Sequence, residues 1–329
     1  LASTTLKSVT ITGDAASAIN VNLAGATLLA AGSVTGSDAA NTVALTAATT
    51  ATIGLDLGAG DDVLSIAQAS QRHTLAGGAG TADTLVAASS INAAAGVNVS
   101  GFEVVSTGAF SVTLPTATNT INNAIFTGTA GAVVGLATGA TVTQAATGTN
   151  TVSNTAGWTA TTDNLIVNVG GATSTGGLTQ SLAAALIETA TITNTQISTN
   201  ATGRTVGVTG AQLAKATVVS SGLAPITFVG GGTSLAEIDA SAVGGVFSFT
   251  PTTVNSLAAG IKITAGAGAD TLTGLTGADT LIGGAGIDTI TGGVGIDTLT
   301  GGAAADTFVY AVNVAGAVVS SLAAPDIIK

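Results

Sequence analysis

The chain has 329 residues, of which 46 are Gly, 7% are charged and none is Cys. Seventeen acidic and six basic residues give a formal net charge of −11, which argues against nucleic-acid binding, because that function needs a basic face. Without Cys the chain has no disulfide, no thiolate metal site and no cysteine nucleophile.

Short alternating runs of Val, Ile, Leu and Thr predict strands along the whole chain. The clearest runs are residues 8–13, 110–114, 165–170 and 205–210, each ended or followed by Gly or Pro. Helical patterning is confined to residues 178–188 and 210–215, the best candidates for a helical turn. Many short strands with few Pro predict an all-β fold, which is a sandwich, a barrel or a solenoid.

Two features of the sequence have to be tested against a membrane protein and an enzyme. Residues 104–162 carry no charge, but Gly, Asn, Thr and Pro115 interrupt them every few positions, whereas a membrane-spanning helix needs ~20 continuous apolar residues. We therefore expect no transmembrane segment. The single His73 has no second histidine for a zinc-protease motif and no serine elbow to serve, so we expect a polar residue at a turn between two strands.

A repeat of nine residues occupies the region from residue 265 onward. Five aspartates keep the spacing without a slip: Asp270, Asp279, Asp288, Asp297 and Asp306. Five apolar residues keep it too: Leu272, Leu281, Ile290, Leu299 and Phe308. A glycine-rich linker would not hold both sets in phase, so the repeat indicates folded structure.

The spacing predicts a physical arrangement. Six Gly-rich residues form a turn whose carbonyl oxygens can point inward, and the next three residues form a short strand whose middle residue faces in. Two such units complete one coil, so the turns 265–270, 283–288 and 301–306 stack on one side and 274–279 and 292–297 on the other. Carbonyl and carboxylate oxygens of stacked turns form cages suited to Ca²⁺, and without the ion the carboxylates repel one another.

The repeat resembles the RTX nonapeptide G-G-x-G-x-D-x-U-x, whose parallel β-roll binds calcium. The resemblance implies several bound Ca²⁺ ions, held by the five aspartates and by backbone carbonyls from the turns. The implied turn residues are Gly266, Gly268, Gly274, Thr276, Gly283, Gly284, Ala285, Gly286, Gly292, Gly293, Val294, Gly295, Gly301, Gly302 and Ala303.

The repeat departs from the family pattern at two positions. Leu275 replaces the second Gly of its row and Ala304 replaces the fourth, so the outermost cages are expected to be less complete. On the family pattern the best site lies between turns 283–288 and 301–306. Sites that pair Asp270 with Asp288, and Asp279 with Asp297, come next.

Two similar turns occur upstream, at residues 57–64 and 77–85, the second with one extra residue before its Asp. We expect a calcium site that involves Asp62 and Asp83, together with Gly58, Gly60, Gly77 and Gly78. The alternative is a pair of Gly-rich hairpin turns with solvated aspartates.

The resemblance extends to the style of the whole chain. The only glutamates, Glu103, Glu188 and Glu237, each precede a predicted strand, and an Asp-Ala-Ser-Ala-Val segment leads into the repeats. Together with the abundance of Ala, Thr, Gly and Val in the rest of the chain, these features resemble the carboxyl-terminal part of surface-layer (S-layer) proteins of Caulobacter-type Gram-negative bacteria. For the glutamates, calcium ligation and solvated charge at a coil corner are both left open.

The expected organisation is a β-solenoid, or parallel β-roll, with additional β-helix-like segments. Residues 1–100 form a β-rich segment with the two RTX-like turns, and 101–260 an S-layer-like repeat region. Residues 261–315 form the calcium β-roll, and 316–329 a truncated carboxyl-terminal extension. The chain is expected to be a fragment of a longer protein, because it shows no initiator Met and no signal-peptide pattern.

The resemblance implies a secreted, extracellular structural protein without catalytic activity. It would fold on meeting Ca²⁺ outside the cell and assemble with copies of itself into a two-dimensional cell-surface lattice. A region outside this sequence would anchor it to lipopolysaccharide. Two alternatives share the same calcium chemistry: an RTX adhesin, and the calcium-binding tail of a secreted hydrolase or polysaccharide-modifying enzyme. A parallel β-helix lyase or epimerase is disfavoured because Lys7, Arg72, Arg204 and Lys215 are too scattered to line a sugar groove.

Overall fold

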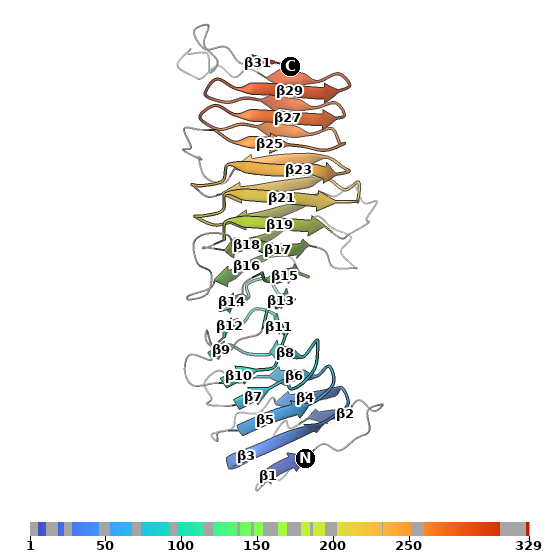
Figure 1. Cartoon of the computed structure of the whole chain (residues 1–329), viewed down its shortest axis with the longest axis vertical. Coiled ribbons are helices and arrows are strands. Elements are labelled where there is room, and N and C mark those ends of the chain that lie inside the picture. Colours follow the sequence, from blue (N-terminus) through green and yellow to red (C-terminus); the bar gives the residue numbers. More distant parts are fainter. Residues whose placement is uncertain are drawn as a thin grey trace. The chain divides into compact units, whose positions relative to one another are not determined.

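The computed structural model shows an all-β chain (Figure 1). It describes residues 6–10, 19–22, 28–45, 53–67, 74–92, 98–114, 121–136, 139–145, 148–153, 164–169, 179–184, 187–194, 203–231, 233–251, 260–309 and 327–328. These residues form strands joined by turns and bends, and none of them is helical. No membrane-spanning helix is found in this part of the chain.

The chain divides into two compact units. Unit 1 comprises residues 1–143 and 150–158, and unit 2 comprises residues 144–149 and 159–329. Each unit is built from rows of hydrogen-bonded strands, and the chain alternates between rows from one strand to the next. The segment boundaries expected near residues 100, 260 and 315 remain predictions.

Unit 1 contains three rows of parallel strands. The first row is β1 (Leu6–Thr10), β3 (Leu28–Ser37), β5 (Ile53–Gly58), β7 (Thr74–Ala76) and β10 (Asn98–Ser100). The second is β2 (Ile19–Asn22), β4 (Asn41–Leu45), β6 (Val63–Ile66), β8 (Thr84–Ala87), β11 (Val104–Thr107), β13 (Asn123–Phe126) and β15 (Thr141–Gln144). The third is β9 (Ile91–Asn92), β12 (Ser111–Thr113), β14 (Ala132–Val134) and β16 (Gly148–Ser153). The last residue of β15 and the first two residues of β16 belong to unit 2.

Unit 2 contains two rows of parallel strands. The first is β17 (Asn164–Val169), β19 (Thr189–Asn194), β21 (Lys215–Ser220), β23 (Glu237–Val243), β25 (Lys262–Thr264), β27 (Thr280–Ala285), β29 (Thr298–Ala303) and β31 (Ile327–Ile328). The second is β18 (Thr179–Ala184), β20 (Arg204–Thr209), β22 (Ile226–Gly231), β24 (Phe247–Pro251), β26 (Thr271–Thr273), β28 (Thr289–Thr291) and β30 (Thr307–Val309). Two strands and the two corners that join them make one coil, which confirms the predicted β-solenoid.

The core lies between the rows and follows from the alternation in sequence. In β26 to β29 the middle residue of each three-residue strand segment points inward, so Leu272, Leu281, Ile290 and Leu299 are fully buried. Burying such a side chain stabilises the fold by about 1.5–3 kcal/mol. Phe308, the fifth member of the series, is only half-buried. Equivalent residues stack along the rows, as Ile263, Leu281 and Leu299 do in register.

One expectation about secondary structure is wrong. The helical patterning expected over residues 178–188 is overridden, because Thr179–Ala184 forms β18 and pairs with β20 over five residues from Thr179↔Thr205 to Ala183↔Thr209. Pairing within the stack outweighs the modest helix propensity of Leu and Ala. Residues 210–215 form a turn that leads into β21. His73 and residues 316–326, on which expectations were stated above, lie outside the described residues.

Candidate metal centre

The Gly-rich turns of unit 2 stack in two columns at opposite corners of the coils. Turns 265–270, 283–288 and 301–306 lead from the first row to the second, whereas 274–279 and 292–297 lead back. Backbone hydrogen bonds tie successive turns together: Ala285 N donates to Gly266 O at 2.8 Å, and Val294 N donates to Leu275 O at 3.0 Å. The period of two repeats per coil therefore brings like positions of alternate repeats together.

A ladder of carboxylates runs along each column. Asp288 Oδ1 accepts a hydrogen bond from Asp270 N at 2.8 Å, and Asp306 Oδ1 accepts one from Asp288 N at 3.0 Å. In the other column Asp297 Oδ1 accepts from Asp279 N at 2.8 Å. Each aspartate thus caps the backbone of the preceding coil. Four of the five aspartates are at most 1% exposed, and only Asp306 is half-buried.

The remaining carboxylate oxygens face carbonyl oxygens of the neighbouring coil. A Cβ atom at Gly283 would overlap Asp288 Oδ2 and lie 2.6 Å from the carbonyl oxygen of Gly301. A Cβ atom at Gly274 would overlap Asp279 Oδ2 and the carbonyl oxygen of Gly292. The first residue of each of these turns must therefore be Gly, because oxygens from two coils fill the space that a side chain would take.

Backbone conformation accounts for the other glycines. Gly284 and Gly286 have φ angles of +110° and +128°, a region that only Gly adopts without strain. The two departures in the repeat have different outcomes. Ala304 keeps the turn at a strained φ of +91°. Leu275, unlike Gly284, does not have a positive φ, so turn 274–279 differs from the others at its second position.

All the turn residues expected to supply carbonyl ligands in unit 2 lie in these two columns. The first column contains Gly266, Gly268, Gly283, Gly284, Ala285, Gly286, Gly301, Gly302 and Ala303, and the second contains Gly274, Thr276, Gly292, Gly293, Val294 and Gly295. Two of them, Thr276 and Val294, form a parallel bridge between coils. These residues lie at the corners, as the sequence predicts. Their role as calcium ligands stays a prediction.

The electrostatics of the corners are unfavourable without a cation. Burial, with a smaller contribution from the charge of Asp288, raises the pKa of Asp270 to about 6. Burial and the charge of Asp297 do the same for Asp279, whose pKa is also about 6. Asp288 has a raised pKa too, from burial and then from Asp306, and its buried Oδ2 has no hydrogen-bond partner among the described residues.

These corners fit a hard cation that is bound mostly by backbone oxygen. Within the described residues no three or more His, Cys, Asp or Glu side chains lie close enough to hold a metal by themselves. A bound ion would therefore be held by two aspartates together with carbonyl groups. Ca²⁺ takes six to eight oxygen ligands, including carbonyls, in flexible geometry.

Unit 1 has a corner of the same kind. Turns 57–62 and 77–83 lead from β5 to β6 and from β7 to β8, and they contain Gly58, Gly60, Gly77 and Gly78 together with Asp62 and Asp83. Asp83 Oδ1 accepts a hydrogen bond from Asp62 N at 2.7 Å, and both aspartates are fully buried. The solvated aspartates of a hairpin pair are therefore not what the structure shows.

The three glutamates differ in position. Glu103 lies at a corner, where its Oε2 accepts a hydrogen bond from Asp83 N at 3.0 Å. Glu188 lies just before β19, and its carbonyl oxygen accepts from Lys215 N at 3.1 Å. Glu237 lies on the outer face of β23, so its side chain is a surface charge and not a corner ligand.

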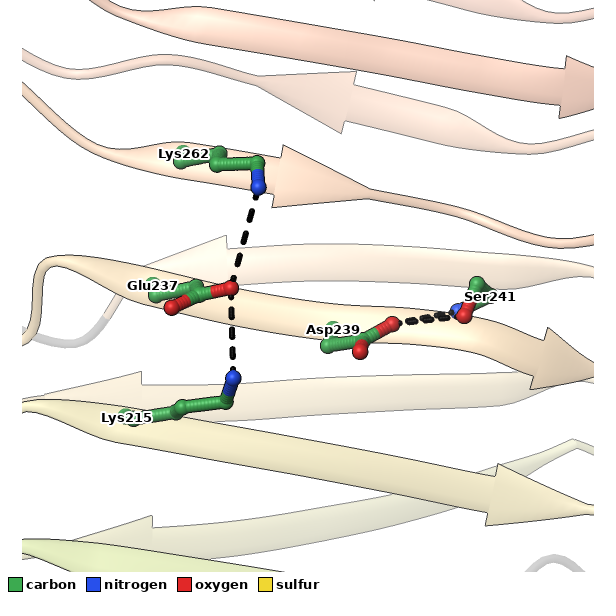
Figure 2. A network of polar contacts seen from close by, with 5 residues as sticks. All are labelled: Lys215, Glu237, Asp239, Ser241 and Lys262. Atoms are coloured by element: carbon green, nitrogen blue, oxygen red, sulfur yellow. Dashed lines mark hydrogen bonds and ion pairs between the residues drawn. The ribbon is translucent and has the colours of Figure 1, made fainter.

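Figure 2 shows the contacts of Glu237. Its Oε1 lies 3.3 Å from Lys215 Nζ and 3.8 Å from Lys262 Nζ, on the two neighbouring strands. Further along β23, Asp239 accepts a hydrogen bond from the Ser241 hydroxyl at 2.7 Å, which lowers the pKa of Asp239, and both lysines add to that effect. The two lysines and the two acidic side chains therefore neutralise one another across neighbouring strands.

Sequence reasoning missed Asn41 at the unit 1 corner, and it left Glu103 open between calcium ligation and solvated charge at a coil corner. Asn41 N donates to Asp62 Oδ1 at 2.5 Å, which continues the ladder by one coil. Asn41, Asp62, Asp83 and Glu103 follow one another at a spacing of 20 or 21 residues, which is a signal for the ladder in the sequence. The signal is hard to recognise because three residue types occupy equivalent positions.

Comparison with known proteins agrees with this geometry in one part of the chain. Residues 262–290 and 282–311 match the RTX calcium-binding nonapeptide repeat. The matched residues cover β25 to β30 and all five aspartates of the unit 2 columns. No curated protein and no solved structure matches the chain. The RTX repeats support calcium binding in general, and a calcium-binding structural or secreted protein.

Proposed function

We propose that the protein is a secreted, calcium-dependent structural component of a bacterial surface layer, without catalytic activity, that assembles with copies of itself. The observation that carries the proposal is the buried carboxylate ladder. Asp270, Asp279, Asp288 and Asp297 are at most 1% exposed and lie against one another at corners that match RTX calcium-binding repeats. A cation that neutralises this charge therefore stabilises the fold.

Calcium dependence supports folding outside the cell. Extracellular calcium modules bind with dissociation constants of ~10⁻⁴–10⁻³ M, and cages of this weak class would stay empty at cytosolic calcium levels. Metal binding and folding are then one equilibrium, because a preformed cage does not exist in the unfolded chain. RTX repeats are typical of secreted proteins, which agrees with export before folding.

The outer faces of the strands support packing of copies against one another. In unit 2 the outward positions of β19 are Thr189, Thr191 and Thr193, and those of β17 include Asn164 and Asn168. The charged stripe at Lys215, Glu237 and Lys262 nearly balances itself. With its corner carboxylates neutralised by Ca²⁺, a chain with 7% charged residues presents little charge to oppose self-association.

The test is to add Ca²⁺ to the purified full chain and image the product by electron microscopy. Ordered sheets that form in Ca²⁺, but not in Mg²⁺ or in a chelator, are the expected result. Calcium-dependent folding that leaves the chain monomeric would overturn the lattice proposal in favour of an adhesin or an enzyme tail. Asp239→Asn, which changes an outer-face charge and no corner, is the matched control for Asp288→Asn.

A further inference from the structure

The corner between turns 57–62 and 77–83 of unit 1 shares with unit 2 the close approach between coils at the second residue of the turn, although Leu57 stands where turns 274–279 and 283–288 begin with Gly. Gly78 has a φ of +116°, and a Cβ there would overlap the carbonyl oxygen of Gly58 in the preceding coil. Gly284 has a φ of +110° and the same relation to Gly266. This corner lies outside the residues that match the RTX repeat, and its coils are 21 residues long instead of 18.

Oxygens of the two turns converge at Gly80. Both carboxylate oxygens of Asp83 and the carbonyl oxygen of Gly60 lie within 2.7 Å of the point where a Cβ of Gly80 would stand. The extra residue of turn 77–83 is held away from this point, because Thr81 N and Ala82 N both donate to Asp61 Oδ1, at 2.9 and 3.1 Å. The longer turn thus keeps the same oxygen-lined interior.

One oxygen at this corner has no partner in the described structure. Asp62 is fully buried, and its Oδ2 has no hydrogen-bond donor among the described residues, while its Oδ1 is capped by Asn41. The only ion pairs of the described residues lie on β23, so no cationic side chain there neutralises Asp62 or Asp83. A buried carboxylate oxygen with neither donor nor counter-charge indicates a missing cation.

The coil before this corner shows what fills an equivalent space when no ion does. The amide nitrogen of Asn41 has four oxygen neighbours: Ala39 O at 2.5 Å, Leu57 O at 3.1 Å, Asp62 Oδ1 at 3.2 Å and Ser37 O at 3.3 Å. An amide group has two hydrogens, so it cannot satisfy four acceptors at once. Asn41 therefore occupies an oxygen-lined space with a neutral donor.

We infer that unit 1 holds its own Ca²⁺ site between turns 57–62 and 77–83. Asp62 and Asp83 are the charged ligands, and backbone carbonyls of the two turns, including those of Gly58 and Gly60, complete the set. Glu103 is a positioning residue that caps Asp83 N and continues the ladder. The inference rests on the calcium dependence in the proposed function, but not on lattice formation.

The experiment is hydrogen–deuterium exchange of the full chain with and without Ca²⁺. At ~10 mM Ca²⁺ and a dissociation constant of ~10⁻⁴–10⁻³ M, amides of β6 and β8 should exchange about 10- to 100-fold more slowly than in a chelator. Asp62→Asn keeps the Oδ1 acceptor and removes the charge. It should abolish the response of β6 and β8 and leave that of β27 and β29 intact.

Asp239→Asn is the control, because Asp239 lies on the outer face of β23 away from the corners and its Oδ1 acceptor is retained in Asn. Asn41→Asp gives an independent readout that does not depend on losing a site. It replaces the neutral donor by a carboxylate and should raise the bound calcium, measured by equilibrium dialysis and atomic emission, by one ion per chain.

A response in β27 and β29 with none in β6 and β8 of the wild type would overturn the inference and leave the proposed function standing. An unchanged response of β6 and β8 in Asp62→Asn would overturn it too. Loss of lattice formation with both exchange responses intact would instead refute the surface-layer proposal alone.

Discussion

Asp288 provides the sharpest test of the ladder, because two substitutions there should have opposite effects. Its Oδ1 caps Asp270 N of the preceding coil, and its Oδ2 crowds the same point as the carbonyl oxygen of Gly301 in the following coil. Asp288→Asn keeps the Oδ1 acceptor, and its amide nitrogen replaces an oxygen that has no donor. Asp288→Ala removes the acceptor and leaves Asp270 N unpaired.

The magnitudes follow from those contacts. In a chelator, Asp288→Ala should destabilise unit 2 by about 1–3 kcal/mol, the cost of a buried N–H without an acceptor. Asp288→Asn should be at least as stable as the wild type, because it removes a buried charge that Asp306 repels. In Ca²⁺ at ~100 times the dissociation constant, each ion stabilises the fold by about 2.7 kcal/mol. Asp288 lines two intervals between coils, so either variant should lose up to about 5 kcal/mol of that stabilisation.

The assay is guanidinium unfolding followed by circular dichroism, in chelator and in Ca²⁺, with Asp239→Asn as the control. Asp288→Asn would then exceed or equal the wild type in chelator and fall below it in Ca²⁺. Equal losses for Asn and Ala in chelator would refute the role of the Oδ1 cap. A full calcium response in Asp288→Asn would refute the cage.

The remaining predictions concern strain, protons and the outer face. Ala304→Gly should stabilise unit 2 by about 0.5–1 kcal/mol in thermal unfolding, because φ is +91° there; no gain would mean that the turn is unstrained. In chelator, stability should rise as pH falls from 7 to 4. The folded pKa of Asp62, Asp270 and Asp279 is about 6, above ~3.9 in the unfolded chain, so folding takes up protons. In Ca²⁺, where protons compete with the ion, the trend should reverse below pH 6, and parallel curves in both conditions would contradict the cage. Glu237→Gln should change stability by less than about 1 kcal/mol and leave the calcium response intact, because both of its ion pairs are exposed.

The sequence predicted the unit 2 corners because an 18-residue coil places two nine-residue repeats in strict register. Asp270 and Asp288 then occupy one column by arithmetic alone. The unit 1 ladder was predicted only in part, because its coils vary in length. Its equivalent positions hold Asn41, Asp62, Asp83 and Glu103 instead of aspartates alone. Asp62, Asp83 and Glu103 each accept a hydrogen bond from a backbone N–H of the preceding coil, so the geometry repeats although the residue type changes.

Position along the strand distinguishes glutamates for which the sequence left both interpretations open. Glu237 and Glu188 look alike in sequence, but Glu188 precedes β19 whereas Glu237 is the first residue of β23 and points outward. A shift of one residue sends a side chain to a different environment. The helical prediction for residues 178–188 failed because tertiary pairing with β20, which the local pattern does not contain, decided the structure of this segment.

The ladder has a direction, and this limits how copies can join. In the ladder of both units, the backbone N–H of an aspartate is capped by the carboxylate of the aspartate one coil further along the chain. Each of these rungs therefore joins an N–H on its amino-terminal side to a carboxylate on its carboxyl-terminal side. Two copies that continued the ladder would have to meet head to tail, since like ends cannot complete a rung. Such a heterologous contact has no twofold axis and leaves a fresh end for each copy added.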